Sequence, residues 1–353
     1  MLVFYLISIL IIIYTFYLAI KSWIAQSEPL SKSNTLTIRG IVIICVILHH
    51  ITQYFNVYGI GAKLFLHTGY IFVGIFFALS GYGNYISYSK NKIGNGTTLK
   101  WTFNRAIKLY ISCFLVIIFS VLSIMILKYE NVVSIKNILK YIITLTLPRW
   151  NNWYLKVQLI LYIVFALTYR YVKKYKLSVF SALIILMIIA MYVNGLDSYW
   201  YNSNLCFCLG IFLAKYKDNI INMSMLKKIT LICSLMCFTM LFIILTLKGP
   251  KLSYNIISIF ISICFVAAIL MLNTIIPLSS KLLSKLGNIS LQIYLVHFIL
   301  IEIFRTMSFN VNIEIVCIFI FTMIIAILFN RIEKIIQNNI NYLFIKSQLE
   351  IKR

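Results

Sequence analysis

The chain has 353 residues, of which 62% are hydrophobic and only 11% charged, and its mean hydropathy is +0.95. These values exclude an ordinary soluble domain and predict an all-α polytopic membrane protein. The net charge of +24 comes from Lys and Arg at the ends of apolar runs, where insertion bias and anionic headgroups account for it. We therefore expect a lipid bilayer, and no nucleic acid, as the partner of these charges.

Apolar runs of spanning length occur eleven times, which predicts about eleven transmembrane helices. The first is followed by Lys21 and has no basic segment before it, which favours a retained helix over a cleaved signal peptide. We expect one membrane domain over 1–353, with an N-terminal helix and inner loop over 1–35, a core over 36–330 and a cytoplasmic tail over 331–353. The runs cover residues 2–20, 38–55, 64–88, 106–127, 153–169, 178–194, 199–214, 229–247, 253–273, 288–306 and 311–330.

The orientation follows from the basic residues in alternate loops. With the N-terminus outside, 23 of them fall on inner segments and eight on outer segments, so the positive-inside rule predicts N-out and C-in. The outer loop that breaks this pattern contains Lys136 and Lys140 on one side of an otherwise apolar stretch from Ile135 to Leu145. This spacing suits an interfacial helix, and a plain connector is the alternative.

The eight cysteines lie mostly inside apolar runs. We interpret them as small core residues, away from each other, and expect neither disulfides nor a metal site.

A fixed cation opens the second run, and two histidines follow it. Arg39 is separated from His50 by three turns, or about 16 Å, so we expect Arg39 at the membrane face and His50 near the middle of the span. Ser80 and His297 fall at related depths in their own runs, and these polar groups predict one lined midplane cavity. The alternative for each is a packing residue with satisfied hydrogen bonds.

The chemistry open to these groups is limited because the spans carry few acids. No carboxylate is found near the midplane, where a proton-coupled or cation-coupled transporter usually needs one. A neutral histidine can instead remove the proton of a hydroxyl, which indicates group transfer to an alcohol. Arg39, Arg105 and Lys108 at the inner face could hold the phosphates of a cytoplasmic donor. Membrane topology alone is the alternative explanation for each cation.

Four segments together resemble the acyltransferase-3 family of integral membrane acyltransferases, which modify surface glycans, lipids and small molecules. Arg39 and His50 match its Arg-x10-His motif, with His49 one residue off that register. Residues 76–82 (FFALSGY) are similar to its Phe-Phe-x-x-Ser-Gly-Tyr segment. Residues 104–110 resemble its Arg-x-x-Arg stretch, and residues 286–297 its Leu-Gly-x-x-Ser-x-x-x-Tyr-Leu-x-His signature.

Two positions depart from the family pattern. Lys108 stands where the family has a second arginine. Lysine keeps the positive charge but lacks the planar guanidinium that can bind a phosphate with two parallel hydrogen bonds. Gln158 stands where the family often carries glutamate, so a carboxylate role does not carry over. The family core usually has ten helices, which makes the first run an added helix and leaves the core to start and finish inside.

The resemblance implies that acetyl-coenzyme A is the acyl donor, a co-substrate that approaches from the cytoplasm, with no permanently bound cofactor. Arg39, Arg105 and Lys108 would hold it, and His50 would be the general base or a transient acyl acceptor. Further candidates for catalysis are His49, Ser80 and His297, and candidates for lining the substrate site are Tyr82, Trp153, Gln158 and Tyr294.

The favoured function is an O-acyltransferase of a bacterial plasma membrane, transferring acetyl to a hydroxyl of a cell-surface polysaccharide or its lipid-linked precursor. A homo-oligomer is compatible with this function. One alternative is a transporter or flippase for a glycan or lipid intermediate, and another is a non-catalytic subunit of a polysaccharide synthase. Replacing His50 by alanine separates them, because only the enzyme loses its product entirely.

Overall fold

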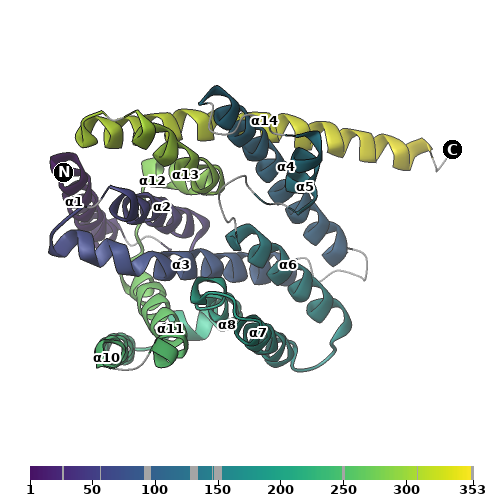
Figure 1. Ribbon diagram of the computed structural model, residues 1–353. Helices are drawn as coiled ribbons and strands as arrows, with labels where there is room; N and C mark the ends of the chain where they lie inside the picture. Colours follow the sequence, from purple (N-terminus) through teal and green to yellow (C-terminus); the bar gives the residue numbers. More distant parts are fainter. Residues whose placement is uncertain are drawn as a thin grey trace. The chain divides into compact units, whose positions relative to one another are not determined.

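The computed structural model describes residues 1–25, 28–55, 57–90, 97–127, 134–144, 146, 153–248, 251–307 and 309–350. Within these ranges all regular elements are helical, as the composition predicts (Figure 1). The helices are α1 (Leu2–Ala25), α2 (Lys32–Tyr54), α3 (Ile60–Lys90), α4 (Thr97–Ile126), α5 (Ile135–Thr144), α6 (Trp153–Tyr171), α7 (Lys176–Val193), η1 (Ser198–Trp200), α8 (Leu205–Lys215), α9 (Lys217–Ile221), α10 (Met225–Lys248), α11 (Lys251–Ile275), α12 (Lys281–Asn288), α13 (Ser290–Thr306) and α14 (Val311–Glu350).

Eight helices of the described residues are long and apolar enough to cross a membrane, and nine if α12 and α13 count as one broken span. The eight are α1, α2, α3, α4, α7, α10, α11 and α14. All eleven apolar runs fall on helices, but the total of eleven spans and their orientation stay predictions. The run over 199–214 forms only η1 and the 11-residue α8, which at about 16 Å is shorter than a hydrocarbon core.

The chain forms two compact units. Unit 1 consists of Met1–Thr102 and Lys156–Asn288, and unit 2 of Phe103–Leu155 and Ile289–Arg353. In unit 1, α3 packs against α2 and α8, α12 packs against α2, and α10 lies beside α11 (Figure 1). In unit 2, α13 packs against α14.

Two helix crossings in unit 1 are so close that only glycine fits at them. A Cβ at Gly81 of α3 would overlap the Phe207 carbonyl of α8, and one at Gly210 of α8 would overlap the Ala78 carbonyl of α3. The crossing of α2 and α12 is built in the same reciprocal way. Gly40 lies against the backbone of Leu283, and Gly287 against that of Leu36. Small residues at crossings let backbones approach closely inside a membrane.

The start of α2 is fixed by hydrogen bonds. Ser31 caps the helix, and Asn34 returns the bond to the Ser31 backbone, which completes a capping box. Leu30, just before the cap, has a left-handed backbone (φ 52°), and its carbonyl accepts the hydroxyl of Tyr82 at 3.0 Å. The helix therefore begins well before the apolar run that starts at residue 38.

Helix α1 contacts segments that flank α2. The Tyr5 hydroxyl donates to the Tyr58 carbonyl, just beyond the C-terminal end of α2. The hydroxyls of Tyr14 and Ser280 lie 2.9 Å apart, and Ser280 also bonds through its backbone to Thr37 of α2. The added helix therefore braces α2 near both ends.

Three further expectations from the sequence have different outcomes. A helix does form at α5, with Lys136 and Lys140 exposed, while its place at a membrane surface stays a prediction. Cys113, Cys206 and Cys208 are buried as expected, but the core assignment is wrong for Cys233 and Cys237, which are exposed one turn apart on α10. Helix α14 continues through residue 331 to Glu350. Residues 351–353 of the expected tail lie outside the described part of the chain.

Candidate functional site

The Arg-x10-His motif lies within α2 of unit 1. Because the capping box starts the helix at Lys32, Arg39 lies two turns inside it and is half-buried, rather than at its entry. His50 lies four residues before the last residue of α2, and the depth of both side chains in a membrane stays a prediction. The distance between the two groups along the helix is unchanged.

His49 is held between α2 and α3. Its Nδ1 lies 2.7 Å from the Phe65 carbonyl oxygen, which can only accept, so Nδ1 carries the proton and donates. The rest of the ring rests on Gly69, where a Cβ would overlap the imidazole. Both ring edges are thus in contact with α3, which gives His49 a packing role.

His50 has a different environment. Its Nδ1 lies 2.9 Å from Oε1 of Gln53, one turn further along α2, and its ring centroid is 4.8 Å from that of His49. Since the amide oxygen accepts, Nδ1 of a neutral His50 donates and Nε2 carries the lone pair. A neutral imidazole oriented in this way has the tautomer of a general base.

The segment over residues 76–82 provides helix contacts. Ser80 is buried on α3, next to Gly81, which meets α8. Tyr82 is also buried, and its hydroxyl bonds the Leu30 carbonyl in front of α2. Packing therefore accounts for this motif in unit 1. A catalytic role for Ser80 and a substrate-lining role for Tyr82 stay predictions.

Gln158 on α6 is buried at 1% exposure, and within the described residues neither of its amide atoms has a hydrogen-bond partner. A buried amide without partners is costly, so the side chain is a strong candidate for contact with a polar ligand group.

Lys108 in unit 2 pairs with a carboxylate that the sequence analysis missed. Its Nζ lies 3.4 Å from Oε1 of Glu333, which is 1% exposed on α14. Glu333 also accepts hydrogen bonds from Ser112, Gln292 and Gln337. In the sequence, Glu333 falls in the predicted tail after the last span, and its burial depends on partners on α4 and α13.

His297 is a buried residue of α13. Its Nδ1 is 3.1 Å from the Ile293 carbonyl oxygen of the same helix, and its ring lies beside Tyr294 and Phe298. Tyr294 contacts Tyr154, which in turn meets Trp153 edge to face.

The structure brings several of the predicted residues together within each unit. In unit 1, His49 and His50 are adjacent, and the segments around Arg39 and Gly287 meet at the α2–α12 crossing. In unit 2, Lys108 and Gln292 share Glu333, and Arg105 is half-buried on α4. One cavity shared by His50, Ser80 and His297 would join the two units and stays a prediction.

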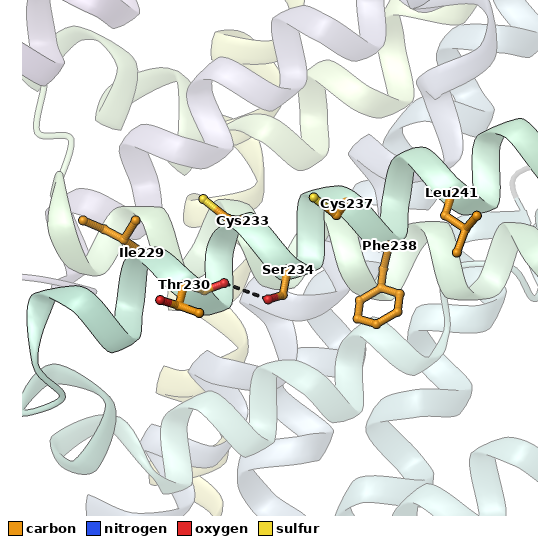
Figure 2. A pocket seen from close by; sticks show the side chains of 7 residues that line it. All are labelled: Ile229, Thr230, Cys233, Ser234, Cys237, Phe238 and Leu241. Carbon is orange, nitrogen blue, oxygen red and sulfur yellow. Dashed lines mark hydrogen bonds between the residues drawn. The ribbon is translucent and has the colours of Figure 1, made fainter.

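A hollow of about 680 Å³ lies along α10, and all of its lining side chains belong to this one helix (Figure 2). The hydrogen bond drawn there, from the Ser234 hydroxyl to the Thr230 carbonyl, stays within α10. This hollow is remote in sequence from the motifs, and its lining is mostly apolar. The lining residues are Ile229, Thr230, Cys233, Ser234, Cys237, Phe238 and Leu241.

A chain with this many apolar helices and an arginine and histidines on one of them is a multi-pass membrane protein. A family model described as an acyltransferase domain matches residues 37–331, which leaves α1 outside the match. The chain therefore belongs to the acyltransferase-3 family of membrane acyltransferases. No curated protein and no solved structure matches it in the corresponding comparisons.

Proposed function

We propose that this family member is an O-acyltransferase that transfers acetyl from acetyl-coenzyme A to a hydroxyl of a cell-surface polysaccharide or its lipid-linked precursor. Membership of an acyltransferase family supports the reaction class. The donor, the acceptor and a place in a bacterial plasma membrane, N-out and C-in, are parts of the proposal.

The observation that carries the proposal is the contrast between the two histidines. Both neutral rings carry the lone pair on Nε2, but that edge of His49 rests on Gly69 of α3, whereas His50 is oriented by Gln53 of its own helix. This arrangement favours His50 as the general base. The register of the Arg-x10-His motif selects the same residue.

The reaction follows from this role. The acceptor oxygen bonds to the carbonyl carbon of the thioester while its proton passes to Nε2 of His50. The tetrahedral intermediate then breaks its carbon–sulfur bond, and the imidazolium returns the proton to the departing thiolate. The products are the acetyl ester and coenzyme A. Arg39, Arg105 and Lys108 are the proposed partners of the donor phosphates, since such cations are the usual ligands of phosphate groups.

The test compares His50→Ala, His49→Ala and His67→Ala in membranes supplied with radiolabelled acetyl-coenzyme A and the native acceptor. His67 is a matched control because it is an exposed histidine on α3. At equal protein levels, we expect His50→Ala to abolish label in the glycan or lipid fraction, and His67→Ala to keep the wild-type rate. A general base typically contributes about 10²–10⁴-fold.

Label that never appears, or that is indifferent to His50, would overturn the proposal. If the His50→Ala protein still moves a glycan intermediate across the membrane while no label is transferred by the wild type, a transporter is the better assignment.

A further inference from the structure

Glu333 is the centre of a polar network inside unit 2. Its Oε2 accepts from the Ser112 hydroxyl of α4 and from Nε2 of Gln292 on α13, the latter at 2.6 Å. Its Oε1 accepts from Nε2 of Gln337 at 3.2 Å and pairs with Nζ of Lys108 at 3.4 Å. Three helices therefore contribute to one buried carboxylate.

The cost of burying a charge explains why donors and a cation surround the Glu333 carboxylate. A buried carboxylate is tolerated when its charge is paired and its lone pairs accept hydrogen bonds. Both oxygens of Glu333 meet that condition. Loss of the carboxylate would leave its donors without their acceptor, so the network holds Lys108 and Gln292 in a defined relation.

Lys108 reaches from this buried centre towards a more open region. Its side chain is 44% exposed, whereas that of Glu333 is 1% exposed. A lysine ammonium has three N–H donors, and the contact with Oε1 of Glu333 occupies one side of it. Lysine also has a flexible four-carbon stem, so binding a ligand normally costs the entropy of ordering it. The pair with Glu333 orders that stem in advance.

We propose that Glu333 is a positioning residue that holds the Lys108 ammonium ready for a phosphate of the acyl donor. This inference rests on the proposed function and extends it from the predicted cations to the acid that orients one of them. It also gives a reason for lysine at this position. A single ammonium can lie between a carboxylate on one side and a phosphate on the other.

The test uses Glu333→Gln, which removes the charge and keeps the size of the side chain. The matched control is Glu314→Gln, because Glu314 is also a buried acid of α14, near its N-terminal end. The kinetic measurement is the ratio of kcat/KM for acetyl-coenzyme A to that for acetyl-pantetheine, which has no phosphates. We expect Glu333→Gln to lower this ratio about 2- to 10-fold, the range for ordering one long side chain, through KM rather than kcat. Glu314→Gln should leave it unchanged.

A second measurement is independent of activity. Coenzyme A added to purified protein should raise the Tm of the wild type and of Glu314→Gln more than that of Glu333→Gln. Lys108→Met should behave as Glu333→Gln does, and the double variant should be no worse than either. If Glu333→Gln does not fold, Glu333→Asp is the substitute, because it retains the negative charge but places it one methylene further from Lys108. Glu333→Asp should lower the ratio of kcat/KM values less than Lys108→Met does.

The outcomes separate the two proposals. Equal losses with both donors, or an unchanged ratio in Glu333→Gln, would show a structural role only and overturn this inference while acetyl transfer stands. A wild type that transfers acetyl from neither donor would instead contradict the proposed function, and a coenzyme A effect on Tm that depends on Glu333 would then still support phosphate binding.

Discussion

The imidazole of His49 occupies the space that a side chain at Gly69 would need, so α2 and α3 touch through a ring on one helix and bare backbone on the other. Gly69→Ala would force the ring away and weaken its bond to the Phe65 carbonyl. We expect a loss of about 1–3 kcal/mol, which is typical of overpacking and is measured as a lower Tm in detergent.

The double variant Gly69→Ala/His49→Ala tests the cause of that loss. Removing the ring makes room for the new methyl group, so the double variant should be more stable than the sum of the single effects predicts. Simple additivity of the two losses would argue against the contact.

The crossing of α3 and α8 gives a second prediction. Gly210→Ala should lower stability by about 1–3 kcal/mol, because the new methyl group would overlap the Ala78 backbone and no flexible side chain can yield. Gly83→Ala is the control on the same helix pair, since no atom lies within 4 Å of a Cβ there. Equal Tm values for the two variants would contradict the close crossing.

Tyr82→Phe tests whether Tyr82 acts in packing or in substrate contact. The variant keeps the ring and loses the bond to the Leu30 carbonyl, which should cost about 0.5–1.5 kcal/mol. Tyr175→Phe, at an exposed site, is the control and should unfold as the wild type does. The opposite result is a changed KM for the acceptor with an unchanged Tm, which would indicate substrate contact.

Gln53 is expected to matter for activity through His50. Gln53→Ala removes the acceptor that orients the ring, so acetyl transfer should fall roughly 10-fold or more, a part of the about 10²–10⁴-fold that a positioned base supplies. Gln53→Glu keeps an acceptor at the same place and should retain more activity than Gln53→Ala. Radiolabel transfer at matched protein levels measures both, and equal rates in all three proteins would remove Gln53 from the mechanism.

The helices were largely predictable because apolar runs of this length have few other structures in a membrane. One apolar run does not form a single continuous helix. The run over 199–214 contains the Tyr201–Asn204 turn, and its burial depends on α3, where the Tyr70 carbonyl accepts the Ser203 hydroxyl at 2.6 Å. Hydropathy sums composition along the chain and carries no information about such distant partners.

The sequence motifs name the candidate site residues, but they do not give the contacts of those residues. The spacing of Arg39 and His50 could be read directly, but the difference between His49 and His50 depends on Phe65 and Gly69 of another helix. The role of Glu333 likewise depends on hydrogen-bond donors that are distant in the sequence. Ser112 is 221 positions away and Gln292 is 41 positions away. Gly81 and Gly287, each in one of the motifs, are explained by the helix backbones that face them.

The reciprocal glycine contacts also restrict motion within unit 1. Backbone meets backbone at both crossings, so α2 cannot slide along α12, and α3 cannot roll on α8, without steric overlap. The α2–α12 crossing therefore fixes the helix that carries His50 against its neighbour, so the two helices of this pair can move only together.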